Sequence, residues 1–208
     1  MLPAFHNEPL TDFTKSENIE AFRAALDKVK AEIGQSYPLV IGGQRIGGDN
    51  TFTSINPARP AEVLGHFVSG TKEQAELALQ AAEQAFKTWQ YTPAAERARP
   101  LLRAAAEMRR RKHEFSATMV LEVGKSWAEA DADTAEAIDF LDYYARQAVR
   151  IEDVSHMLVQ HGPEHLSLTN IPLGVGVIIP PWNFALAIPT GMVAAAIVAG
   201  NAVIFKPA

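Results

Sequence analysis

Two polar side chains, Asn183 and Lys206, occupy positions from which they could act on a bound molecule. Asn183 lies in the turn-forming stretch 180–184 (PPWNF), and Lys206 follows a short apolar run directly before a proline. An amide can donate hydrogen bonds to an oxygen that gains negative charge during a reaction, and an ammonium group can donate to hydroxyl or phosphate oxygens. Taken alone, each residue has a simpler interpretation, because an asparagine in such a turn usually only forms the turn and a lysine before a proline is usually solvated.

The segments around these two residues have a strand–loop–helix–strand pattern. Residues 174–179 and 202–205 are short β-branched apolar runs, which are typical of strands buried on both faces. Residues 187–199 between them predict a helix, and Gly200-Asn201 would end it with a left-handed cap. Such a βαβ unit has its functional loops beyond the carboxyl ends of its strands. We therefore expect Asn183 and Lys206 to lie at one edge of a sheet.

Three other clusters suggest chemistry but have plainer explanations. Three acids fall in the first turns of a helix predicted to begin after Ser126, where the helix dipole favours negative charge, and we prefer this explanation to a metal site. Three histidines lie in a linker without acids at helical spacing, so no metal site is predicted there either. A basic run reads as a solvated helix face. These residues are Glu129, Asp131 and Asp133; His156, His161 and His165; and residues 109–112.

Composition narrows the class of protein. The net charge of −5 argues against a nucleic-acid partner. The chain contains no cysteine, which fits a reducing compartment, so we expect a cytoplasmic protein. The beginning of the sequence, MLPAFHNEPL, is not a secretory signal. The long uncharged stretch from residue 171 to residue 205 is interrupted by prolines and Asn183, so no membrane segment is predicted.

The remainder of the chain predicts mainly helices with a few short strands. We expect a helix over residues 17–33, a hairpin turning at Gly42-Gly43, and extended segments over 51–57 and 61–67. Thr71 with Gln74, and Ser126 with Glu129, have the spacing of capping boxes. Thr92-Pro93 predicts another helix start, residues 115–123 continue helically, and residues 166–171 alternate like a strand.

The chain strongly resembles the aldehyde dehydrogenase superfamily. The resemblance is carried by residues 171–184 (IPLGVGVIIPPWNF) together with 199–208 (AGNAVIFKPA), and residues 121–125 (LEVGK) support it. Within the superfamily, residues 5–9 (FHNEP) and 136–145 (EAIDFLDYYA) resemble the 1-pyrroline-5-carboxylate, or L-glutamate γ-semialdehyde, dehydrogenases of proline degradation. The similarity extends over nearly the whole chain.

The resemblance implies an α/β fold and a division of the chain. It implies an incomplete Rossmann-type NAD-binding domain over residues 37–152 and 172–208, with a helical layer. An N-terminal helical arm would span residues 1–36, and residues 153–171 would be a strand segment of an oligomerisation layer. Residues 40–52 would add strands to that layer, and the protein would be a homo-oligomer.

The resemblance also implies a reaction. A cysteine thiolate attacks the aldehyde, hydride passes to NAD⁺, and water hydrolyses the resulting thioester to a carboxylic acid. Asn183 matches the asparagine that stabilises the oxyanion, and Phe184 would line the substrate tunnel. Lys206 matches the lysine that hydrogen-bonds the adenosine ribose of the cofactor. Three further residues match positions where the main chain approaches the cofactor: Ile179, Pro180 and Trp182.

The superfamily pattern continues beyond residue 208, to a glutamate base and the nucleophilic cysteine. We therefore expect this chain to be about the first two-fifths of an enzyme and to be inactive alone. Two alternatives are a stand-alone, non-catalytic nucleotide-binding or assembly module and an aldehyde dehydrogenase of another substrate class.

Overall fold

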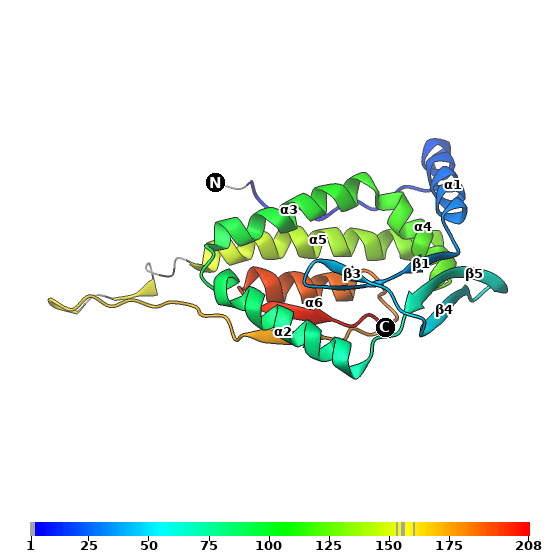
Figure 1. Cartoon of the computed structure of the whole chain (residues 1–208). Helices are drawn as coiled ribbons and strands as arrows, with labels where there is room; N and C mark the ends of the chain where they lie inside the picture. The colour runs from blue at the N-terminus through cyan, green and yellow to red at the C-terminus, as the bar shows by residue number, and fades with distance from the viewer. Residues whose placement is uncertain (1–2, 153, 155–156, 160) are drawn as a thin grey trace.

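The computed structural model describes residues 3–152, 154, 157–159 and 161–208. Long helices form the body of the molecule, and short strands lie along one side and at one end (Figure 1). The helices are α1 Ser16–Ala31, α2 Lys72–Trp89, α3 Ala94–Arg110, α4 Lys112–Glu122, α5 Trp127–Glu152 and α6 Ala187–Val198. The strands are β1 Gln35–Tyr37, β2 Leu39–Ile41, β3 Gln44–Ile46, β4 Thr51–Asn56, β5 Arg59–Val68, β6 Val175–Ile178 and β7 Ala202–Phe205.

The βαβ unit predicted from the sequence is confirmed. Strands β6 and β7 are parallel and in register from Val175↔Ala202 to Ile178↔Phe205, and α6 connects them. The helix ends in a Schellman arrangement, in which Gly200 has φ +96° and Asn201 N donates to the Ala196 carbonyl (3.1 Å). The Asn201 side chain also accepts from the backbone N–H of Leu173 at 2.7 Å. This contact ties the end of α6 to the start of β6.

The core is formed by α3, α5 and α6, and small side chains dominate it. Alanines supply most of the buried positions, including Ala98, Ala145 and Ala194, with Leu101 and Ile138 among the larger ones. Because alanine adds so little bulk, the three helices approach closely and bury much backbone. Such a core is sensitive to any added atom.

Side chains from α2 and α3 hold the carboxyl end of α6. Trp89 Nε1 donates to the Ile197 carbonyl at 2.8 Å, and Arg97 Nε donates to the Val198 carbonyl at 2.7 Å. The last carbonyls of a helix have no partner within the helix, so Arg97 satisfies the Val198 carbonyl, while Trp89 adds a second donor to the Ile197 carbonyl, which also accepts from Gly200 N. They also fix α6 relative to α2 and α3.

The N-terminal half contains two small sheets. Strands β2 and β3 form the predicted hairpin, with Gly42 at φ +57° and Gly43 at φ +80°, as a type I′ turn requires. Strands β4 and β5 are antiparallel, which confirms the two extended segments. Strand β1, which pairs parallel to β5, was not predicted, because its three residues are all exposed and show no pattern. The place of residues 40–52 in an oligomerisation layer stays a prediction.

Two helices begin as the sequence predicts, and one helix begins differently. Both capping boxes are present, at Thr71 with Gln74 and at Ser126 with Glu129. Helix α3, however, is preceded by Pro93 as its cap residue rather than by Thr92, and its first N–H, Ala94 N, donates to the Glu152 carboxylate of α5 instead. Helix α1 also lacks a side-chain cap, so it depends on packing, with Phe22 fully buried.

Residues 3–12 run along α5 in an extended conformation. They are the first part of the arm predicted over residues 1–36, and below the name N-terminal arm means residues 3–12 alone. Arg146 donates to the Pro3 carbonyl (2.7 Å), Asp139 accepts from Glu8 N (2.7 Å), and Asp131 accepts from Thr11 N (2.7 Å). The residue numbers of the partners on α5 decrease as the residue numbers along the arm increase, so the two segments run antiparallel. Fifteen helical residues span about 22 Å, and eight extended residues span about 26 Å, so the lengths match.

The strand predicted over residues 166–171 is wrong for the described residues. These residues are exposed and carry no strand assignment, and their segment extends away from the helical body (Figure 1). Alternation of apolar and polar residues is compatible with a strand but does not by itself determine one. His156 lies outside the described residues.

No helix in the described part of the chain is both long enough and apolar enough to cross a bilayer.

Candidate functional site

The parallel register of β6 and β7 determines which predicted site residues meet. Ile178 pairs with Phe205, and Lys206 N donates to the Ile178 carbonyl at 3.0 Å. Ile179 and Lys206 therefore leave the sheet side by side at its carboxyl edge. The backbone then turns through residues 179–186 before α6 begins, and this segment is called the site loop below.

The site loop presents its side chains unevenly. Ile179 is 62% exposed and Trp182 is 73% exposed, while Pro180 is buried. Asn183 and Lys206 are both exposed. Within the described residues no hydrogen bond joins Asn183 to Lys206 or to another side chain. The amide is therefore available to a bound molecule, and its position depends on how the loop around it is held.

Two residues outside the predicted site, Lys125 and Asp133, hold the site loop. Asp133 Oδ1 accepts a hydrogen bond from Ala187 N at 2.7 Å, and its Oδ2 lies 2.6 Å from Lys125 Nζ. Lys125 Nζ in turn lies 4.7 Å from the centre of the Phe184 ring, within the range of a cation–π contact. The Asp133 side chain is completely buried, and that of Lys125 is 14% exposed. This pair is called the Lys125–Asp133 clasp.

The clasp gives α6 an N-terminal cap from another helix. Leu186 precedes α6 and offers no capping side chain, and the first turn of α6 contains no acid of its own. The Asp133 carboxylate therefore meets both an unpaired N–H and the positive end of the helix dipole. A charged acceptor makes a strong hydrogen bond, so the junction between the site loop and α6 is fixed.

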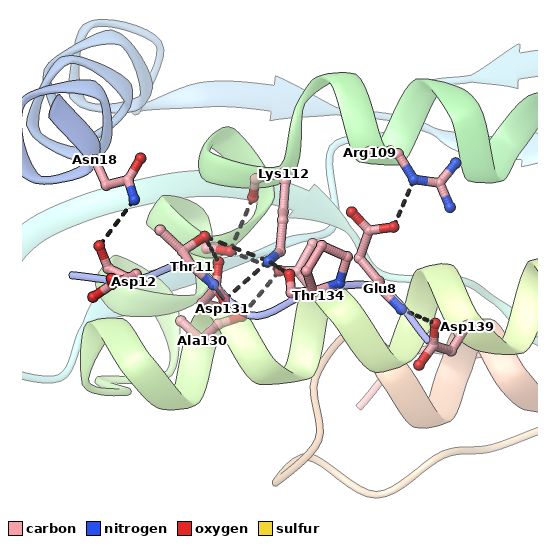
Figure 2. Close-up of polar contacts among 12 residues, drawn as sticks. Glu8, Thr11, Asp12, Asn18, Arg109, Lys112, Ala130, Asp131, Thr134 and Asp139 are labelled. Carbon is pink, nitrogen blue, oxygen red and sulfur yellow. Dashed lines mark hydrogen bonds and ion pairs between the residues drawn. The ribbon is translucent and has the colours of Figure 1, made fainter. Parts of the chain in front are cut away.

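Asp131 makes an equivalent pair on a different side of α5. Its Oδ2 lies 2.9 Å from Lys112 Nζ, and its oxygens accept from Thr11 N (2.7 Å) and Thr11 Oγ1 (2.6 Å) (Figure 2). Lys112 also donates to the Pro9 carbonyl at 2.8 Å. This pair is called the Lys112–Asp131 clasp, and it holds the N-terminal arm rather than the site loop.

The dipole interpretation of the three acids is therefore correct only for Glu129. Glu129 is exposed in the first turn, and hydrogen bonds from Ser126 lower the pKa of its carboxyl. Asp131 and Asp133 are buried and paired with lysines, and their separate partners show that the three acids do not converge. Among the described residues, no three metal-ligating side chains lie close enough together to hold a metal ion. The signal that could have revealed the burial is the spacing of Asp131 with Thr134, Ile138 and Leu141 along one apolar face.

The chain belongs to the aldehyde dehydrogenase family, because the model of that family matches residues 46–208. It is 52% identical over all its 208 residues to the 1-pyrroline-5-carboxylate dehydrogenase of Geobacillus thermodenitrificans, and 51% identical to that of Bacillus pumilus. In both cases it spans 40% of the relative's length.

Solved structures give the same result. The chain resembles a 1-pyrroline-5-carboxylate dehydrogenase from Thermus with bound NAD, with a TM-score of 0.92 and 47% identity, covering all of this chain and 40% of that one. It also resembles the Δ-pyrroline-5-carboxylate dehydrogenase of Mycobacterium tuberculosis with bound NAD, with a TM-score of 0.83 and 30% identity, covering 39% of that chain. The architecture is therefore a partial aldehyde dehydrogenase fold.

Proposed function

We propose that this chain is part of an NAD⁺-dependent dehydrogenase that oxidises L-glutamate γ-semialdehyde, in equilibrium with 1-pyrroline-5-carboxylate, to L-glutamate in proline degradation. The observation that carries the proposal is the 52% identity over all 208 residues to a relative named for that substrate. Because the chain spans 40% of that relative, the reaction is assigned to the whole protein.

The carboxyl edge of β6 and β7 is the proposed cofactor site. Exposed Ile179 and Trp182 offer apolar surface to the flat rings of a dinucleotide, and exposed Lys206 offers an ammonium donor to ribose hydroxyls. Pro180 is buried, so its side chain offers no surface to a ligand. When bound, NAD⁺ accepts the hydride from the substrate.

Asn183 is proposed to stabilise the oxyanion. When a thiolate adds to an aldehyde, the carbonyl oxygen becomes negatively charged, and a preorganised amide N–H lowers the energy of that state. Removing one such donor typically costs about 3 kcal/mol in the transition state. Phe184, on the next position of the site loop, is proposed to line the path of the substrate's carbon chain.

The thiolate must come from elsewhere in the whole protein, because these 208 residues include no cysteine. We therefore expect the purified 208-residue chain to produce no NADH from NAD⁺ and glutamate γ-semialdehyde. NADH formation by this chain would contradict the proposed chemistry. Calorimetry with NAD⁺ tests the alternative of an autonomous nucleotide-binding module, for which the isolated chain would bind tightly.

Activity of the whole protein is the main test. We expect NADH to form with glutamate γ-semialdehyde, and Asn183→Ala to lower kcat by about 10²- to 10³-fold with little change in KM. Asn18→Ala, a change to an amide on α1, is the matched control and should leave kcat unchanged. Equal kcat for wild type and Asn183→Ala would contradict the oxyanion role, and a preference for another aldehyde would change the substrate class.

We also propose that the whole protein is a cytoplasmic homo-oligomer. The segment that extends from the body carries apolar side chains that face solvent, with Ile171 80% and Leu173 100% exposed. Contiguous exposed apolar residues commonly mark a protein interface. The absence of cysteine in this chain is in keeping with a reducing compartment.

A further inference from the structure

The site loop is fixed at both ends, and Asn183 lies between the fixed points. At its start, Ile178 is paired in the sheet and its carbonyl accepts from Lys206 N at 3.0 Å. At its end, Ala187 N donates to the buried Asp133 carboxylate at 2.7 Å. Asn183 itself makes no side-chain hydrogen bond within the described residues. Its amide is therefore positioned by its neighbours.

The residue next to Asn183 is held separately. The Phe184 ring lies under the Lys125 ammonium, at 4.7 Å from Nζ to the ring centre. Lys125 precedes α5, and its Nζ is pinned by Asp133 at 2.6 Å. Asp133 therefore contacts the site loop in two ways. It binds the end of the loop directly, through Ala187 N, and it holds Lys125, which in turn contacts the Phe184 ring.

The charge balance at Lys125 distinguishes two possible roles. A lysine beside a substrate path could bind the carboxylate of an acidic aldehyde. Here, however, the ammonium already has a fully buried carboxylate as its partner, so the clasp carries no net charge. A neutral pair is a poor anchor for a substrate carboxylate, but a rigid pair is a good support for a ring and a helix end.

We propose that the Lys125–Asp133 clasp positions Asn183 and Phe184 for oxyanion stabilisation, with Lys125 and Asp133 as positioning residues that do not touch the substrate. The inference rests on the proposed function, and it adds two residues from the α4–α5 region to the machinery of the site loop. It also predicts that the clasp affects turnover equally for acidic and neutral aldehydes.

A double-mutant cycle in the whole protein tests the proposal. Lys125→Met should lower kcat by roughly 10- to 100-fold, because small displacements of a catalytic group have effects of that size. In an Asn183→Ala background the same change should lower kcat by less than about twofold, since the group to be positioned is gone. The loss should be the same with glutamate γ-semialdehyde and with an uncharged aldehyde such as propanal.

A second variant avoids an unpaired buried charge. Lys125→Met with Asp133→Asn removes both charges, and the asparagine oxygen can still accept from Ala187 N. This pair of changes should fold and should show the same kcat loss as Lys125→Met. The matched control is Lys112→Met with Asp131→Asn in the other clasp, where the lysine and aspartate side chains are similarly buried, at 10% and 2% exposed. It should lower the melting temperature but leave kcat within about twofold.

The outcomes separate the two proposals. Equal kcat losses for Lys125→Met in the wild-type and Asn183→Ala backgrounds would overturn the positioning role, and so would no loss at all. A loss confined to the acidic aldehyde would overturn it in favour of a carboxylate anchor. If Asn183→Ala alone left kcat unchanged, or if no aldehyde were oxidised, the proposed function would fail and the inference with it.

Discussion

Asp131 and Asp133 lie two residues apart on α5 and contact different parts of the molecule. Residues at i and i+2 of a helix face different sides, so Asp131 meets Lys112 and the N-terminal arm, while Asp133 meets Lys125 and the site loop. A buried carboxylate without a partner would be very unfavourable, which explains why each has a lysine within 3 Å. The sequence shows the positions of the two acids but does not indicate which lysines pair with them, because the lysines come from other elements.

His113 provides a prediction about pH. It lies edge-on to Phe22, and its buried Nδ1 has no hydrogen-bond partner among the described residues. Burial lowers the pKa of His113 below its ordinary 6.5; the nearby Asp131 carboxylate has a smaller, opposing effect, and the Lys112 ammonium lowers the pKa slightly further. Between the two pKa values the unfolded chain binds more protons, so this contribution to stability is complete above about pH 6.5 and declines as the pH falls.

We therefore expect His113→Phe to reduce the pH dependence of stability. The difference in melting temperature between about pH 7.5 and about pH 5.5 should be smaller in the variant than in the wild type. Other titrating groups are common to both proteins and cancel in the comparison. Identical pH dependences would show that His113 takes up its proton equally in the folded and unfolded states.

Helix α6 depends on its neighbours at every point. Asp133 caps its start, while Trp89 and Arg97 bind its last carbonyls. Along its length, Gly191 is buried against Phe140 of α5, and a Cβ at this glycine would come within 2.9 Å of the Phe140 ring. The helix has almost no polar side chains of its own, so other elements supply its polar contacts.

Gly191→Ala should therefore be destabilising, although the same change in an open helix gains about 1 kcal/mol. We expect a loss of about 1–3 kcal/mol from overpacking, measured as a lower free energy of unfolding in urea. Phe140→Leu in combination should recover part of that loss, because it removes the ring that the new methyl group meets. Additive effects of the two changes would contradict direct contact.

The sequence predicted the elements whose signals are local and missed those that depend on distant partners. The strands at residues 174–179 and 202–205, the helix between them and the glycine cap are all encoded by apolar runs and turn residues, so the βαβ unit was confirmed. Strand β1 and the clasp residues Lys125 and Asp133 have no local signal. They acquire their roles only when another segment comes alongside them.

The N-terminal arm joins the ends of the helical body into one unit. Its contacts reach from Arg146 to Asp131 along α5. Arg109 of α3 adds an ion pair to Glu8 at 2.6 Å (Figure 2). The Lys112–Asp131 clasp lies under the arm, so the arm also excludes water from a buried ion pair. The arm is therefore structural, although it has no helix or strand of its own.

Removal of residues 1–12 should expose this clasp and destabilise the protein. We expect a net loss of about 2 kcal/mol, after the entropy of ordering the arm is subtracted from its hydrogen bonds. The melting temperature should fall by about 4–8 °C. Limited proteolysis should cut α5 faster in the shortened protein. An unchanged melting temperature would show that the arm's contacts do not add to stability.

The path of the arm has a consequence for the order of folding. Its partners are far away in sequence, with separations of 120 residues for Thr11 and Asp131, 132 for Asn7 and Asp139, and 143 for Pro3 and Arg146. During synthesis the arm leaves the ribosome before the helix to which it binds exists. Contacts of such long range form late, after local helices have paired. Docking of the arm should therefore be among the last steps of folding, and it would seal a surface that nascent chains leave open to chaperones.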